Sequence, residues 1–285
     1  FDLPQTANFQ VFLIMLITGF ATVSVVLGLQ HGIRRLSVLS TWLAALLMIF
    51  MLVVGPTLFI LDSFVQNLGF YIQELPALGT WAAVYKQSDW QAGWTIFYWG
   101  WWFAWAPFVG IFIARISRGR QIKEFIFGVL LAPTLAVFIW ITIFGGTALH
   151  EELFQGGGIV EAVNANLSTA MYVLLERFPF SNISSLFVIL AGVVFFVTSS
   201  DSGSLVVDFI TTGGKHNPPV KQRIFWALME GIVASVLVMG GGLIALQTGS
   251  LATGVPVAVV LLFLCFGLKK GFDEYLKTPP HKDTS

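Results

Sequence analysis

The sequence predicts an all-α membrane protein with seven transmembrane helices. Three observations predict this class: an apolar composition, seven long apolar segments, and basic residues gathered on one side of those segments. Of the 285 residues, 56% are hydrophobic and 11% are charged, with a mean hydropathy of +0.82. A soluble domain carries about 25% charged residues, too many for this chain to match while covering its apolar side chains. The composition and the zero net charge therefore argue against a soluble enzyme, a disordered scaffold and a nucleic-acid partner.

Seven segments have the length and composition of membrane spans. A transmembrane helix needs about 20 apolar residues to cross the hydrocarbon core of a bilayer. The segments lie at residues 8–29, 39–62, 93–114, 125–147, 184–212, 223–246 and 251–268. The fifth is the longest, and we expect it to cross the membrane at a tilt.

The basic residues lie on one side of the predicted membrane. Alternate connections and the C-terminal tail hold thirteen of the fifteen: Arg34, Arg35, Arg115, Arg118, Arg120, Lys123, Lys215, Lys221, Arg223, Lys269, Lys270, Lys277 and Lys282. The other two, Lys86 and Arg177, lie in opposite connections that are otherwise acidic. Cytoplasmic loops carry the excess of Lys and Arg. The sequence therefore predicts a multi-pass protein of the plasma (inner) membrane with a cytoplasmic C-terminus.

Three stretches lie outside the predicted spans. Residues 63–91 and 158–178 mix apolar and polar residues, which is typical of short amphipathic helices at the membrane interface. Ordinary extracellular loops are the alternative for both. Residues 269–285 are predicted to form a cytoplasmic tail.

The third segment carries an unusual aromatic pattern. Five of the ten Trp lie within residues 94–105. An interfacial aromatic belt accounts for Trp94, but Trp99 to Trp105 lie about 7 to 17 Å further along a helix. A spacing of i, i+3, i+4 and i+7 places four aromatic residues on one face: Tyr98, Trp101, Trp102 and Trp105. Such a face suits a quaternary ammonium ion. Two hypotheses remain open from the residues alone, a cation-binding site near the membrane midplane and simple helix packing.

The fifth segment contains a polar run. Six of the seven residues from Thr198 to Ser204 have polar side chains, and one of them is Asp201. Asp201 lies about 16 Å from the cytoplasmic end of this helix, and an acid at that depth marks an ion or substrate path. Hydroxyl and carbonyl oxygens suit a small hard cation such as sodium. For each hydroxyl alone, hydrogen bonding back to its own helix is the favoured interpretation. Glu230, in the sixth segment, is a second intramembrane acid with an expected structural role.

Glycine and proline predict bends or close helix contacts within the spans. These positions are Gly55-Pro56, Pro107, Gly145-Gly146 and Gly240-Gly241-Gly242. The sequence shows no catalytic motif and no metal-ligand spacing of its His residues, so we expect neither an enzyme nor a cofactor. A seven-helix receptor and a passive channel remain as other classes. A retinal-binding Lys is absent from the last segment, and the single cysteine, Cys265, cannot form the internal disulfide usual in peptide receptors.

Two stretches resemble the betaine/carnitine/choline transporters. The first is Phe97-Tyr-Trp-Gly-Trp-Trp102 with Trp105-Ala-Pro-Phe-Val-Gly110, leading into Ala114-Arg-Ile-Ser-Arg-Gly-Arg120; the second is Phe196-Val-Thr-Ser-Ser-Asp-Ser-Gly203. The resemblance extends over essentially the whole chain. It implies an inverted-repeat (LeuT-like) secondary transporter for osmolytes such as glycine betaine, choline or carnitine.

The resemblance also implies a division of the chain. Residues 1–75 would hold the last two helices of the first repeat, 63–91 the linking amphipathic segment, and 92–268 the second five-helix repeat. The family's earlier helices are missing, and the chain begins with Phe, so we expect it to be the C-terminal portion of a longer member. The family's members are commonly homotrimers, which we carry over.

Residue roles follow from the same resemblance. Trp102 would form a wall of the cage for the trimethylammonium group. The pathway toward the cytoplasm would be lined by Trp101, Trp105, Phe108 and Phe112, and the outer approach by Trp94, Tyr98 and Trp99. The side chains of Thr198 and Ser199 and the carbonyl of Phe195 would bind sodium. Sodium-coupled symport is therefore favoured over sodium-independent exchange, with proton-coupled choline uptake as the alternative.

Overall fold

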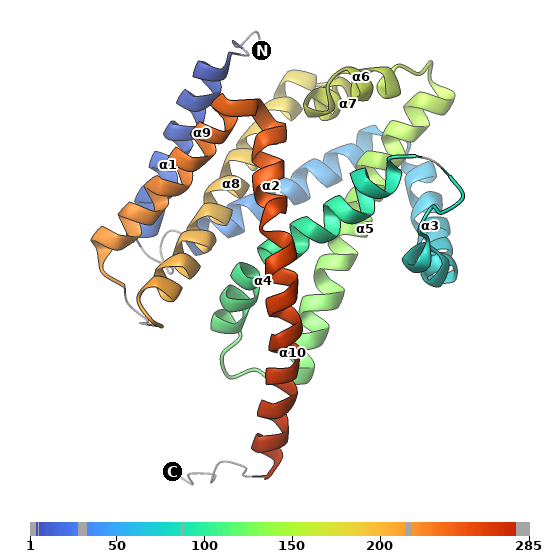
Figure 1. The fold of residues 1–285 in the computed structure, drawn as a ribbon. Helices are drawn as coiled ribbons and strands as arrows, with labels where there is room; N and C mark the ends of the chain where they lie inside the picture. Colours follow the sequence, from blue (N-terminus) through green and yellow to red (C-terminus); the bar gives the residue numbers. More distant parts are fainter. Residues whose placement is uncertain (1–3, 5, 28–32, 87, 215–217, 278–285) are drawn as a thin grey trace.

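The computed structural model describes residues 4, 6–27, 33–86, 88–214 and 218–277; most of these residues are helical and none of them forms a strand. The predicted all-α class is therefore confirmed (Figure 1). The α-helices are α1 (Ala7–Leu27), α2 (Ile33–Val54), α3 (Thr57–Thr80), α4 (Phe97–Ile116), α5 (Ile122–Phe154), α6 (Ile159–Ala165), α7 (Ala170–Leu175), α8 (Ser181–Thr211), α9 (Val220–Ala252) and α10 (Gly254–Lys277). A π-helical turn, η1 (Gln91–Ile96), precedes α4, and a 3-10 turn, η2 (Leu167–Thr169), precedes α7. Of the residues used for the orientation, Lys215 and Lys282 lie outside the described part, as does the end of the predicted tail, residues 278–285.

Six stretches of the described chain are long and apolar enough to cross a membrane. The first five contain α1, α2, η1 with α4, α5 and α8, and the sixth, Val220–Lys277, contains both α9 and α10. The seven predicted segments correspond to these helices, with the last two joined at Thr253. Large apolar side chains cover the outside of the bundle; Phe263 and Phe266 on α10, for example, are 71% and 73% exposed. The chain is thus a multi-pass membrane protein.

The second predicted span differs from the structure at both ends, since α2 begins at Ile33, before the predicted start at residue 39, and ends before residue 62. It was expected over 39–62, but α2 ends at Val54 and a separate helix, α3, begins at Thr57. Pro56 has no amide hydrogen and disfavours a helical conformation at Gly55. In addition, a β-carbon at Gly55 would lie 2.6 Å from the carbonyl oxygen of Met51. The sequence remains apolar on both sides of this break, so hydropathy alone does not reveal the boundary between α2 and α3.

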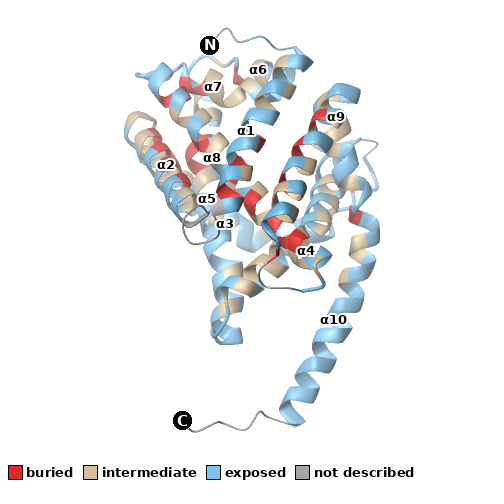
Figure 2. Cartoon of the chain, turned by 90° about the vertical axis from the view of Figure 1, so that its left-hand side faces the viewer, coloured by how far each residue is buried: buried red, intermediate tan, exposed pale blue. Residues whose placement is uncertain are grey.

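Residues 269–277, the first part of the predicted cytoplasmic tail, are helical, because α10 continues to Lys277. The added turns are polar and exposed, and Lys270 lies 4.0 Å from Glu274 at the helical i, i+4 spacing. Hydropathy marks the apolar part of such a helix and not its end. The C-terminal half of α10 extends beyond the other helices (Figure 1, Figure 2).

The predicted glycine bend in α9 is confirmed. Gly241 and Gly242 leave the helical conformation, with φ/ψ of −175°/20° and 64°/−151°. The positive φ of Gly242 is a conformation that other residues rarely adopt. At Pro107, by contrast, α4 remains one continuous helix.

Residues 158–178 form α6, η2 and α7, as their amphipathic pattern predicted. Glu152, near the end of α5, fixes the entry to α6 because its Oε2 accepts hydrogen bonds from the backbone amides of Ile159 and Val160 at 2.7 and 3.2 Å. These short helices close one end of the bundle (Figure 1).

Two groups of packed helices position the candidate site. Helices α1, α8 and α9 pack side by side, and Figure 2 shows buried residues along their facing sides. A second apolar core joins α2, α3, α5, α6, α7 and α8 through Leu43, Leu47, Met51, Ile60, Ile143, Phe144, Ile159, Leu174, Leu175 and Ala191. Helix α8 belongs to both groups, so its polar run lies at their junction.

Candidate substrate and cation site

Aromatic residues form a stacked row that begins before η1 and continues into α4. Trp90, Trp94, Tyr98 and Trp101 follow one another with ring centroids 5.9 to 6.4 Å apart. The rings of Trp94 and Tyr98 are nearly parallel, at 12°. Trp102 and Trp105 form a separate edge-to-face pair at 5.8 Å, and Trp99 packs against Phe103 at 5.5 Å. The face predicted from spacing is therefore divided between two aromatic groups.

A cavity of about 380 Å³ lies between α2, α4 and α8. It brings together three of the predicted pathway residues, Trp105, Phe108 and Phe112, with two of the three predicted sodium ligands, Thr198 and Ser199. Its other lining residues are Ser37, Val109, Ile113, Ser202 and Gly203. An aromatic wall on α4 thus faces a hydroxyl-rich wall on α8.

The predicted cation ligands on α8 are close to one another. The hydroxyl of Thr198 donates to the backbone carbonyls of Val194 and Phe195, each at 3.0 Å. The hydroxyl oxygen of Thr198 and the carbonyl oxygen of Phe195 are therefore 3.0 Å apart. Ser202 donates to the Thr198 carbonyl at 2.9 Å, and Thr198 and Ser202 both line the cavity.

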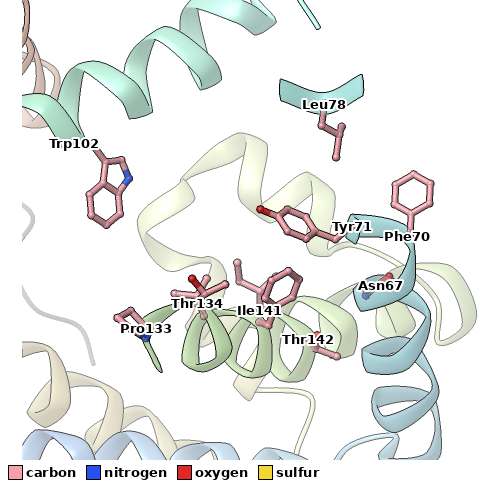
Figure 3. Close-up of a pocket in the computed structure, with 11 residues that line it drawn as sticks. Asn67, Phe70, Tyr71, Leu78, Trp102, Pro133, Thr134, Ile141 and Thr142 are labelled. Atoms are coloured by element: carbon pink, nitrogen blue, oxygen red, sulfur yellow. The ribbon is translucent and has the colours of Figure 1, made fainter. Parts of the chain in front are cut away.

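Trp102 lines a larger cavity of about 610 Å³, bounded by α3, α4 and α5. Figure 3 shows its indole across this space from Tyr71, with Pro133 and Thr134 below. Most of the lining is apolar, and the polar side chains that reach it include Asn67, Thr134 and Thr142. Trp102 is 59% exposed. The structure thus places Trp102 and Trp105 on the walls of different cavities.

The two intramembrane acids are not among the residues that line the 380 Å³ cavity. Asp201 is fully buried, and the hydroxyl of Ser24 on α1 donates to its Oδ2. Its Oδ1 has no hydrogen-bond partner among the described residues. Glu230 on α9 accepts from Ser200 and Ser204 at 2.8 and 2.9 Å. The described residues contain no group of three or more His, Cys, Asp or Glu side chains able to hold a metal ion.

Sequence reasoning missed several residues of this region. Ser37 comes from α2, and periodicity within one helix cannot reveal a residue from another helix. Ser202 could have been found, because it follows Thr198 by one helical turn on the same face. Ser24 lies 177 residues from Asp201, and only the folded structure brings them together.

The comparisons with known proteins support the family resemblance that was based on α4 and α8. The family model of the betaine/carnitine/choline transporters (BCCT) matches residues 1–277. The chain is 47% identical over 274 residues to a glycine betaine/proline/choline transporter of Vibrio parahaemolyticus, covering 95% of this chain and 48% of that protein. It is 47% identical over 272 residues to an uncharacterized transporter of Mycobacterium tuberculosis, covering 94% and 46%. A glycine betaine transporter of Acinetobacter baylyi is 40% identical over 271 residues, covering 95% and 41%.

The chain spans about half the length of the curated relatives it matches. The family match covers the Trp-rich α4 and the hydroxyl run of α8, on which the sequence resemblance was based. It is a match to transporters, in agreement with the prediction that the chain is not an enzyme. The predicted family is confirmed, and the chain belongs to the betaine/carnitine/choline transporters.

Proposed function

We propose that the chain serves in a sodium-coupled secondary transporter for quaternary ammonium osmolytes, such as glycine betaine, choline or carnitine. The observation that carries this proposal is the cavity in which Trp105, Phe108 and Phe112 face Thr198 and Ser199. The names of relatives from Vibrio and Acinetobacter support the substrate class. Uptake of such osmolytes would protect a cell against osmotic stress.

The aromatic wall suits the substrate. A trimethylammonium group has no hydrogen-bond donor and is attracted to the faces of aromatic rings, by about 0.5 to 2 kcal/mol for each contact. Trp102 would hold this group in the cage, and Trp101, Trp105, Phe108 and Phe112 would line its path toward the cytoplasm. Trp94, Tyr98 and Trp99 would form the outer approach.

The hydroxyl wall suits sodium. The hydroxyl oxygen of Thr198 retains a lone pair while its hydrogen is donated within the helix. Together with the hydroxyl of Ser199 and the carbonyl of Phe195, it would supply three neutral oxygens. A hard cation is bound by oxygens of this kind, and such sites in transporters lie near the membrane midplane.

Alternating access would couple the two ligands. Sodium would bind more tightly to the outward-open state and stabilise it, and substrate binding would complete the closed complex. Movement of the helices that carry the aromatic wall relative to those that carry the hydroxyl wall would then open the path inward. We also propose a homotrimer in the plasma (inner) membrane with its C-terminus in the cytoplasm.

Transport into vesicles tests the proposal. The protein is expressed from its complete reading frame and reconstituted, and accumulation of radiolabelled glycine betaine and choline is measured under an inward sodium gradient. We expect accumulation above the external concentration. Equilibration without accumulation would indicate a passive channel and contradict the proposal. Accumulation driven by a proton gradient and insensitive to sodium would contradict sodium coupling and support the proton-coupled alternative.

A further inference from the structure

We infer that Glu230 of α9 is a positioning residue for the cation-binding turn of α8. This inference rests on the proposed sodium site at Thr198, Ser199 and Phe195, and it assigns to Glu230 the orientation of that site. The geometry that carries it is one carboxyl group bridging two hydroxyls of a neighbouring helix.

Glu230 binds α8 at two points. Its Oε2 accepts from Ser200 at 2.8 Å and its Oε1 accepts from Ser204 at 2.9 Å. These serines are four residues apart and lie on one face, one above the other. A single hydrogen bond would leave α8 free to rotate about that contact, whereas two bonds one turn apart fix both its rotation and its height relative to α9.

The bridged face of α8 differs from the face that carries Thr198 and Ser202. At 3.6 residues per turn, the direction midway between Ser200 and Ser204 lies about 200° from that midway between Thr198 and Ser202. Thr198 and Ser202 line the 380 Å³ cavity. A rotation of α8 by about 20° would move an oxygen at its outer radius of about 5 to 6 Å by roughly 2 Å. Ligand distances in metal sites are held to within about 0.2 Å, so the site depends on this rotation being fixed.

Close packing of α9 against its neighbours accompanies the contact between Glu230 and α8. The next residue, Gly231, lies against Thr18 of α1, and a β-carbon there would come within 2.4 to 2.9 Å of three Thr18 side-chain atoms. On α8, a β-carbon at Gly203 would lie 3.6 Å from Oε1 of Glu230. Gly231 therefore permits the close approach of α9 to α1 beside Glu230, and Gly203 lies within ordinary van der Waals distance of the carboxyl group.

Loss of a positioning residue should change sodium affinity, whereas loss of a merely structural residue should change protein stability. Without Glu230, the hydroxyls of Ser200 and Ser204 can donate to carbonyls of their own helix, so few polar groups are left unsatisfied. Stability should then change little. The sodium affinity of the site should decrease more than the stability does, because residues that orient metal ligands typically affect metal affinity by about 10- to 100-fold.

Sodium-dependent uptake tests this role in the reconstituted protein from the complete reading frame. We expect Glu230→Ala to raise the sodium concentration for half-maximal uptake by about 10-fold or more. Glu230→Gln should retain most of the wild-type value, because an amide can still bond to both hydroxyls. The double variant Ser200→Ala/Ser204→Ala should match Glu230→Ala, and combining all three changes should add nothing. An unchanged half-saturation in Glu230→Ala, or fully additive effects, would overturn the inference.

Ser235→Ala is the matched control. Ser235 lies on the same helix, is buried, and its hydroxyl has no hydrogen-bond partner among the described residues. Its removal should leave sodium half-saturation unchanged. An equal effect of Ser235→Ala would show general disturbance of α9 and would overturn the specific role of Glu230.

Thiol labelling decides the inference independently of the coupling ion and of transport. In a Cys265→Ser background, Ser202→Cys on the cavity face should react with N-ethylmaleimide in permeabilised membranes, and Val197→Cys, 4% exposed on the packed side, should be protected. Adding Glu230→Ala should raise the labelling of Val197→Cys relative to Ser202→Cys several-fold. An unchanged ratio would overturn the inference. If wild-type uptake is independent of sodium, the proposed coupling fails and this ratio alone decides the role of Glu230.

Discussion

Gly254, the first residue of α10, packs directly on the backbone of Gly100 in the first turn of the Trp-rich helix α4. A β-carbon at Gly254 would lie 2.5 Å from the carbonyl oxygen of Gly100 and 3.1 Å from its α-carbon. A backbone cannot move aside as a side chain can. The crossing of α4 and α10 is therefore set by the absence of a side chain at position 254.

We predict that Gly254→Ala separates α4 from α10 and strongly reduces uptake. Overpacking of this kind costs about 1 to 3 kcal/mol. The control is Gly100→Ala, whose β-carbon would meet only the flexible end of Leu251, at 2.9 Å. Thermal unfolding of the detergent-solubilised protein should show a clear decrease in melting temperature for Gly254→Ala and a smaller decrease for Gly100→Ala. Equal melting temperatures for both variants would contradict the crossing.

The contact between Gly231 and Thr18 leads to a prediction about α1 and α9. Gly231→Ala should destabilise the protein, since Thr18 is β-branched and cannot turn away. Thr18→Gly should partly restore stability in the double variant by removing all three atoms in conflict. Gly19→Ala, whose β-carbon would meet nothing within 4 Å, serves as the control. Rescue is measured as the melting temperature of the double variant against each single one, and no rescue would refute this packing.

The hydrogen bond from Ser24 to Asp201 predicts an unusual sensitivity at α1. Ser24→Ala leaves both oxygens of a fully buried carboxyl group without a partner among the described residues, a loss of about 1 to 3 kcal/mol. Ser40→Ala removes a similarly buried hydroxyl that donates only to the nearby carbonyl of Ser37. The first variant should reduce stability and uptake more than the second. The opposite order, measured by melting temperature, would contradict the contact.

The proposed role of Trp102 in the cage leads to a prediction about substrate affinity. Trp102→Leu should raise the apparent KM for glycine betaine and choline by about 2- to 30-fold, since a cation–π contact contributes about 0.5 to 2 kcal/mol. Trp42→Leu changes a residue of the same size that is 64% exposed on α2, and its KM should remain that of the wild type. An unchanged KM in Trp102→Leu would remove this residue from the cage.

Much of the fold could be predicted from the sequence because hydropathy reports the strongest local constraint in a membrane. An apolar helix of about 20 residues must satisfy its own backbone hydrogen bonds, so the helices themselves were found. Their ends were found less well. The apolar run of α2 continues past the break at Gly55-Pro56 into the first residues of α3, and the last turns of α10 are helical although they carry charged residues.

The candidate site could be predicted only one helix at a time. The hydroxyl run of α8 and the aromatic run of α4 are visible in the sequence, and the cavity joins three pathway residues with two of the three predicted sodium ligands. The partners of Asp201 and Glu230 could not be predicted, because a hydrogen bond between helices leaves no periodic pattern in either one. The separation of Trp102 from Trp105 depends on which helices pack against α4, which is again a property of the whole bundle.

Sodium dependence in a variant without the α8 hydroxyls tests the central claim most directly. The double variant Thr198→Ala/Ser199→Ala is compared with Ser250→Ala, an exposed serine that donates to the carbonyl of Leu246, and glycine betaine uptake is measured against sodium concentration. A polar contact to a charged group contributes about 1.5 to 3 kcal/mol, which corresponds to about a 10-fold or greater change in half-saturation. We predict that increase for the double variant and none for Ser250→Ala. Identical sodium curves for the wild type and the double variant would contradict a sodium site on α8.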